Sequence, residues 1–324
     1  MINKDNNKND DLKSYINDEN EVSFSELLSA IWGGKLFIIF VSALFAASAI
    51  AIALSIPNIY KASAIMAPVS SDGGTGGLAG LAGKFGGLAS MAGINIGAGD
   101  TTDKTALALE IINTRAFIER FIAKHKLAVP IIAAKNWDYI SNQLNYDEDI
   151  YDSENKKWVR EVKYPKKPEP SPWETYTEFS KLLTVSQSKL TSMVTIEIEY
   201  YSPQMAQQWL TWIISDINNF MREQDKKEAQ DSINYLTEKL ENIQNSNMEN
   251  IFYQLIEEQT KNMMLTQVKP EYVLKTIQPP QVPDEKSKPQ RALIVILGTL
   301  LGGILSVLIV LFRFFSKRTA KRTV

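Results

Sequence analysis

The sequence predicts an α+β fold in which two transmembrane helices flank one α/β base domain with a long projecting helix or helical hairpin. Three observations predict this fold: two apolar stretches without charge, one strand with strict alternation and one long helical stripe. Residues Leu36–Ile56 and Ala292–Phe312 are each 21 residues long and contain no Asp, Glu, Lys or Arg. At about 1.5 Å per residue each spans about 31 Å as a helix, which matches a hydrocarbon core of about 30 Å.

The residue inventory excludes several classes of site. The chain has no Cys and a single His, so disulfides, zinc-finger ligand sets, cysteine nucleophiles and paired imidazoles are excluded. His125 lies between two lysines with no Ser, Cys or carboxylate at a telling spacing, and we interpret it as a solvated residue at a helix end. We find no catalytic constellation, metal site or cofactor site and predict that the protein is not an enzyme. The region between the apolar stretches, 57–291, has 26 basic and 30 acidic side chains, which is unlike the strongly basic face that binds nucleic acid.

The charge beside the apolar stretches predicts how the chain crosses the membrane. The tail Arg313–Val324 carries five basic side chains and no acid, which is typical of a segment held in the cytoplasm. Two crossings then place both termini in the cytoplasm and the main domain outside the inner membrane. A signal peptide is not expected, because a polar arm precedes a stretch longer than a usual signal core of about 7–15 residues. The predicted domains are a cytoplasmic arm (1–35), a membrane helix (36–56), an outer domain (57–291), a second membrane helix (292–312) and a cytoplasmic tail (313–324).

A short amphipathic pattern precedes the first membrane helix. Within Glu21–Lys35 the apolar residues Phe24, Leu27, Leu28 and Ile31 recur at helical spacing. This segment either lies on the cytoplasmic membrane surface or leads directly into the membrane helix, and both interpretations stay open.

A Gly-rich segment follows the first predicted strand, Tyr60–Val69. Gly73–Gly99 holds eleven of the sixteen glycines, with an apolar residue every three or four positions. A phosphate-binding loop is excluded, because the Gly-Lys pair at Gly83 has neither a Gly five residues earlier nor a following Ser or Thr. Two interpretations remain: a flexible loop, or a segment that packs on itself, on a neighbouring subunit or against the outer leaflet.

The middle of the chain combines a loop, a helix start and a strand. Asn136–Trp158 is expected to be a hydrated loop, and its acidic group fails the calcium-loop pattern because Tyr151 holds the fifth position. A capping box from Ser171 to Glu174 predicts a helix start. Met193–Tyr200 alternates strictly between apolar and polar residues, which predicts a half-buried strand.

The last part of the outer domain is predicted to be mainly helical. Ser202-Pro203 begins an extended helical region (203–267) whose apolar stripe is interrupted by the polar segment Arg222–Ser232. We expect that segment to project from the globular body and a second helix to return. A closing strand, Glu271–Ile277, then leads into a Pro-rich connector (278–290).

The connector and the second membrane helix carry a motif, and with the two-span architecture it resembles the polysaccharide co-polymerases of the Wzz chain-length-determinant family. The family pattern is P-x2-P-x4-S-P-K-x11-G-G. The matching residues are Pro280, Pro283, Pro289, Gly302 and Gly303, whereas Lys288 and Gln290 replace its Ser and Lys. SELL and GGK before the first span and YKASA after it are also similar to family sequence.

The resemblance implies an inner-membrane regulator that sets O-antigen modal length in lipopolysaccharide biosynthesis. Expected partners are further copies of the chain in a ring such as an octamer, a Wzy-type polymerase and undecaprenyl-linked polysaccharide. The main domain is then periplasmic. In such a ring the Gly-rich segment would line the lumen near the glycan, with candidate positions Gly73, Gly77, Gly83, Gly87, Gly93 and Gly97. Five tryptophans offer rings for sugar stacking, although aromatic residues at helical spacing are usually core.

Small residues follow one face of the second membrane helix. Gly298, Gly302 and Ser306 recur every four residues, so this face can approach Leu36–Ile56 or a membrane helix of another protein, unless the glycines are there by chance. The main alternative function is a co-polymerase for exopolysaccharide or capsule export. That type commonly adds a cytoplasmic tyrosine kinase. The short tail after Phe312 leaves no room for a fused kinase, so the kinase of this alternative would be a separately encoded partner. A two-span sensor would need a cytoplasmic output domain, which neither terminal segment can hold.

Overall fold

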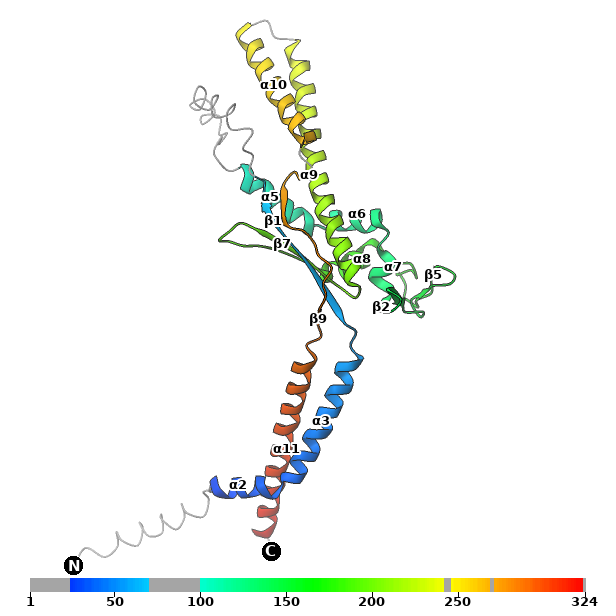
Figure 1. The fold of residues 1–324 in the computed structure, drawn as a ribbon, viewed down its shortest axis with the longest axis vertical. Helices are drawn as coiled ribbons and strands as arrows, with labels where there is room; N and C mark the ends of the chain where they lie inside the picture. Colours follow the sequence, from blue (N-terminus) through cyan, green and yellow to red (C-terminus); the bar gives the residue numbers. More distant parts are fainter. Residues whose placement is uncertain (1–23, 70–99, 242–245, 269–270, 323–324) are drawn as a thin grey trace, which may run out of the picture. The chain divides into compact units, whose positions relative to one another are not determined.

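The computed structural model describes residues 24–69, 100–241, 246–268 and 271–322, which fall into two compact units. One unit comprises the described residues up to Ile56 and from Pro289 onward, and the other comprises those within Pro57–Lys288 (Figure 1). Terminal apolar helices, a mixed helix and strand unit and one long helix confirm the predicted fold class. The domain boundaries drawn from the sequence stay predictions.

The first unit consists of three helices. They are α2 (Phe24–Gly33), α3 (Lys35–Ser55) and α11 (Arg291–Arg322). By length and apolar composition, Lys35–Ser55 and Arg291–Ser316 can each cross a membrane. Most of their side chains are not covered by other parts of the chain. α2 is a separate helix that runs across the direction of α3 and α11 (Figure 1). Phe24, Leu28 and Trp32 are exposed on it, which favours the interpretation of a helix on the membrane surface.

The second unit is built on an antiparallel sheet with strand order β6-β7-β1-β8, in which β9 also pairs with β1. In β1 and β7, residues on one face are buried and those on the other are half-exposed, with Ala64 opposite Ile196 and Met66 opposite Val194. The predicted alternation of the β7 strand is therefore confirmed. The strands are β1 (Ile59–Pro68), β6 (Leu183–Gln187), β7 (Val194–Tyr200), β8 (Leu274–Gln278) and β9 (Lys286–Lys288).

Helices pack on the buried face of this sheet and form the core. Thr114 separates α5 from α6 and caps α6 by accepting a hydrogen bond from the Phe117 backbone. Trp209 is fully buried against Phe179 and Tyr200, as expected for an aromatic residue at helical spacing. Burial raises the pKa of the Tyr200 phenol, whose hydroxyl donates to the Pro130 carbonyl. The helices are α5 (Asp100–Asn113), α6 (Arg115–His125), α7 (Ala128–Ala133), α8 (Pro172–Leu182) and α9 (Pro203–Leu240).

The prediction of a hydrated loop over Asn136–Trp158 is wrong, because this part of the chain forms two short hairpins. In the first hairpin Trp137 lies opposite Leu144, and in the second Tyr151 lies opposite Trp158. Asn142 and Lys156 adopt positive φ angles in the turns, a geometry that tight turns require. The strands are β2 (Ala134–Asp138), β3 (Gln143–Tyr146), β4 (Tyr151–Asp152) and β5 (Lys157–Trp158).

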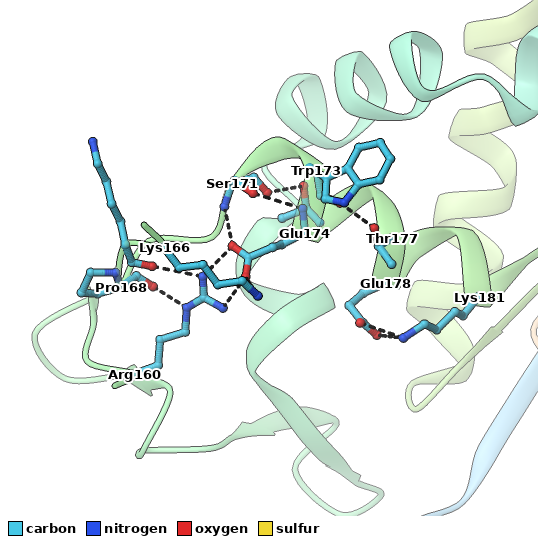
Figure 2. Close-up of polar contacts among 11 residues, drawn as sticks. Arg160, Lys166, Pro168, Ser171, Trp173, Glu174, Thr177, Glu178 and Lys181 are labelled. Carbon is cyan, nitrogen blue, oxygen red and sulfur yellow. Dashed lines mark hydrogen bonds and ion pairs between the residues drawn. The ribbon is translucent and has the colours of Figure 1, made fainter. Parts of the chain in front are cut away.

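The predicted capping box starts α8 and is extended by an arginine. Ser171 accepts from the Glu174 backbone, and the Glu174 carboxylate accepts from the Ser171 backbone. Figure 2 shows that Arg160 reaches the same carboxylate, 2.9 Å from its Nη2, while its Nε donates to the Pro168 carbonyl. Both charged side chains are largely buried, so this network holds the segment from Arg160 to Ser171 against the start of α8.

We expect Glu174→Gln to flatten the acid dependence of stability. Hydrogen bonds from Arg160 first, and then from the Ser171 backbone, lower the pKa of Glu174 from 4.5 to about 2. Because unfolding then takes up a proton, the contribution of the carboxylate is complete above about pH 5 and is lost as the pH falls toward about 2; its size is at most about 3 kcal/mol. Thermal unfolding of the full chain in detergent should therefore weaken more steeply with acid in the wild type than in Glu174→Gln. If the unfolding temperatures of the two proteins fell in parallel with decreasing pH, the lowered pKa of Glu174 would be contradicted.

The predicted projecting region is an antiparallel pair of helices, α9 and α10 (Ser246–Val268), that pack on each other. Ser202 caps α9, as the sequence indicates. Near the middle of α9, the buried Asn218 accepts hydrogen bonds at Oδ1 from the backbone N–H groups of Tyr272, Val273 and Leu274. Its Nδ2 donates to the Leu274 carbonyl at 3.1 Å. One polar side chain thus fixes the start of β8 on the helix.

Candidate functional site

The Pro-Gly motif that the sequence singled out is divided between the two units. Pro280 and Pro283 lie in the connector between β8 and β9, and Pro289 begins the return to α11. Gly298, Gly302 and Gly303 lie inside α11. The motif therefore consists of a connector beside the sheet and a contact face on an apolar helix that can cross a membrane.

The connector is held to α9 at one end and to the sheet at the other. The Pro280 carbonyl accepts a hydrogen bond from Gln207 Nε2 of α9 at 3.4 Å. After the prolines, β9 pairs with the start of β1, where Ile59 lies opposite Lys288. Lys288, which replaces the Ser of the family pattern, forms an ion pair with Glu199 on β7. This departure from the pattern therefore has a structural role of its own.

Two glycines of α11 allow close packing against α3. A Cβ atom added to Gly298 would lie 2.6 Å from the Ala49 Cβ, and one added to Gly302 would lie 2.5 Å from the Phe45 Cβ. Both distances are too short for real side-chain carbons, so the helices approach this closely only because these positions lack side chains. Gly303 differs, because its added Cβ would meet Ser42 Oγ at an ordinary 3.7 Å.

The ends of the same helix pair show further contacts. A Cβ on Gly34, just before α3, would lie 2.7 Å from Val310 Cγ1. At the opposite end, Arg291 Nε donates to the Ala53 carbonyl at 3.1 Å, which satisfies one of the free carbonyls in the last turn of α3. In the structure the small-residue face of α11 therefore packs on α3 of the same chain. This is the first of the two partners that the sequence allowed, the other being a membrane helix of another protein.

His125 differs from the prediction of a solvated residue. It is the last residue of α6, but its ring stacks on Trp212 at 4.3 Å and its side chain is only 14% exposed. Its Nε2 lies 2.9 Å from Asp216 Oδ2, and Lys124 pairs with the other carboxylate oxygen. The sequence showed only the lysines on either side of His125. It did not show that one turn of α9 supplies both of its partners, Trp212 and Asp216.

The remaining candidate residues serve local structure or lie outside the residues that the structure describes. Trp158 packs against Tyr151 within its hairpin, and Arg115 lies over the ring of the half-exposed Trp173. Within the described ranges, no three His, Cys, Asp or Glu side chains gather in a way that could hold a metal ion. The six candidate glycines between 73 and 97 lie outside the described residues.

Together, these features define a class of protein: an α+β unit joined at both ends to apolar helices that can cross a membrane and that pack on each other through small residues. Residues 20–125 match the family model "Wzz: Chain length determinant protein". This match confirms, over these residues, the resemblance to Wzz-type polysaccharide co-polymerases. A second model, "GNVR: G-rich domain on putative tyrosine kinase", matches residues 242–315.

Comparison with solved structures gives distant matches. A "full-length bacterial polysaccharide co-polymerase" is 15% identical, with a TM-score of 0.40, and the match covers 91% of this chain and 99% of that chain. A fragment of WzzB, a polysaccharide co-polymerase from Salmonella Typhimurium, is 13% identical, with a TM-score of 0.32, and the match covers 71% of this chain and 100% of that chain. No curated protein matches the sequence.

Proposed function

We propose that the protein is a non-enzymatic inner-membrane regulator that sets the modal length of O-antigen in lipopolysaccharide biosynthesis. The observation that carries this proposal is the chain-length-determinant match over residues 20–125, which includes α2, α3 and β1. The protein acts as a homo-oligomeric ring such as an octamer, together with a Wzy-type polymerase and its undecaprenyl-linked polysaccharide. Both termini are cytoplasmic and the unit within Pro57–Lys288 is periplasmic.

The mechanism we propose is positional rather than chemical. In the described part of the chain, the buried polar groups Asn218, Glu174 and Asp216 each hold one element against another. The chain runs directly from α3 into β1 and from β9 into α11, so the sheet has two covalent connections to the apolar helices. Within their own units, α3 packs on α11 and β9 pairs with β1. Such a frame can present a fixed surface to a polymerase and to a growing glycan, and the Gly-rich segment with Gly83 and Gly87 remains the predicted glycan-proximal part.

A second candidate function is favoured by a specific observation. The match of residues 242–315 to a domain found on tyrosine kinases points to the co-polymerases of exopolysaccharide or capsule export. That match includes α10, the connector and most of α11. In this alternative the chain works with a separately encoded kinase, and its glycan is a capsule or a secreted polysaccharide.

A chromosomal deletion distinguishes the two functions. If the chain sets O-antigen length, the deletion strain is expected to lose the modal cluster of bands in its lipopolysaccharide ladder, and the plasmid-borne gene restores it. Capsule and exopolysaccharide sizes are measured in the same strains by gel filtration. An unchanged ladder with altered capsule or exopolysaccharide would contradict the first function and support the second.

A further inference from the structure

The turn of the β2–β3 hairpin presents two apolar side chains to the surroundings. Tyr139 is 81% exposed and Ile140 is 94% exposed. Single exposed apolar residues are common on protein surfaces, so exposure alone does not indicate a binding surface. Here the two are adjacent at the tip of an ordered hairpin, and the rest of the turn fixes their position.

The turn is held by side chains on both sides of the tip. The Asp138 carboxylate accepts hydrogen bonds from the Ile140 backbone at 3.0 Å and from the Ser141 hydroxyl at 2.7 Å. Trp137 Nε1 donates to Asn142 Oδ1 at 3.0 Å, and Asn142 adopts a φ of 53°, which Asn tolerates well. A tip held in this way loses little conformational entropy when it binds a surface.

Ring contacts connect this turn to the start of β1. The Trp137 ring packs edge-on against Tyr139 at 5.8 Å and against Tyr60 at 5.6 Å. Tyr60 follows Ser55, the last residue of α3, by five residues. A chain of that length spans at most about 18 Å, so the covalent connection limits how far the Tyr60 backbone can lie from the helix end. The ring contacts then tie the hairpin to this point of the chain.

We propose that the Tyr139-Ile140 tip inserts into the interfacial layer of a phospholipid bilayer, on the side of the membrane where α3 ends. Tyr and Trp are enriched in this layer, because an aromatic ring with a polar group suits the boundary between headgroups and hydrocarbon. The tip then gives the folded unit a third attachment to the membrane besides its two covalent connections. This inference requires α3 to span the membrane, and it holds for either glycan considered above.

The β6–β7 turn provides a matched control in the same unit. Leu190 at this turn is 97% exposed, so it is as accessible as Ile140. Tyr60 pairs with Tyr200, whereas Met66 pairs with Val194, so the Leu190 turn lies at the opposite end of β1 from Tyr60. At about 3.3 Å per residue, that end lies about 20 Å farther along the strand.

The test uses the full chain in vesicles of phosphatidylethanolamine and phosphatidylglycerol. Since the sequence has no Cys, Ile140→Cys and Leu190→Cys each take a single environment-sensitive fluorophore. We expect nitroxide groups on the lipid to quench the label at position 140 and to shift its emission to the blue relative to detergent, with neither effect at position 190. Adding Tyr139→Asp to the Ile140→Cys chain should abolish the quenching and leave the unfolding temperature unchanged.

Three results would overturn the proposal. Equal quenching at positions 140 and 190, or none at either, would show that the Tyr139-Ile140 tip has no special contact with lipid. A label at position 140 that is protected from iodide in solution but not quenched by nitroxide lipid would show that protein covers the tip. Neither result depends on polysaccharide length, so failure here is distinguishable from failure of the proposed function.

Discussion

Replacing Asn218 by Ala is expected to lower the free energy of unfolding by about 3 kcal/mol, because buried backbone groups left without partners cost about 1–3 kcal/mol each. The Oδ1 of Asn218 accepts from three consecutive N–H groups, with the shortest distance, 2.9 Å, to Val273. Its side chain is buried in α9, so water cannot easily take its place. Thermal or chemical unfolding of the full chain in detergent measures the loss.

The neighbouring residue provides the control for this variant. Asn219 has the same side chain on the same helix, but it is exposed, and its hydrogen bonds to Ser215 and Arg222 stay within about one turn of α9. We expect Asn219→Ala to change the stability by less than about 0.5 kcal/mol, as is usual for surface positions. If the two variants unfold alike, Asn218 does not hold β8 on the helix.

Patterns within short stretches predicted much of the fold. The two apolar stretches, the alternation of β7 and the Ser171–Glu174 capping box each follow from residues that are close in sequence. Such patterns reflect local geometry, since a strand exposes every second residue and a helix start leaves N–H groups that a nearby side chain can accept. These elements are where the sequence and the structure agree.

Contacts between distant residues could not be predicted in this way. Asn218 and the start of β8 are separated by more than fifty residues, and nothing beside either segment indicates the other. The stacking of His125 on Trp212 likewise joins two helices whose pairing the sequence does not show. The two small hairpins were missed because each strand is short and its turn uses Asn142 or Lys156 at positive φ rather than glycine.

In the candidate site, too, the local pattern could be predicted from the sequence but the contact partners could not. The spacing of Gly298 and Gly302 predicted a face for close helix packing, but two partner helices remained possible. The structure adds which atoms meet and shows that the adjacent Gly303 has room for a methyl group. Two glycines that look equivalent in the motif therefore differ in what a side chain would contact.

Replacing Gly302 by Leu is expected to separate α3 from α11, and Gly302→Ala already forces a shift. The added Cβ would lie 2.5 Å from the Phe45 Cβ, which is attached to the backbone and cannot swing away. Overpacking of this kind typically costs about 1–3 kcal/mol, and the larger Leu side chain increases the displacement. The unfolding temperature in detergent, the size of the purified complex and the glycan length ladder should all change for Gly302→Leu.

Gly303→Ala is the matched control for Gly302→Ala, because both variants add one methyl group to neighbouring positions of α11. Its Cβ meets Ser42 Oγ at an ordinary contact distance, and Ala is favoured over Gly inside a helix by about 1 kcal/mol. We therefore expect Gly303→Ala to be neutral or slightly stabilising while Gly302→Ala is destabilising. If Gly302→Leu left the stability, the complex size and the glycan lengths unchanged, close packing of α11 on α3 would have no role in holding the membrane helices together.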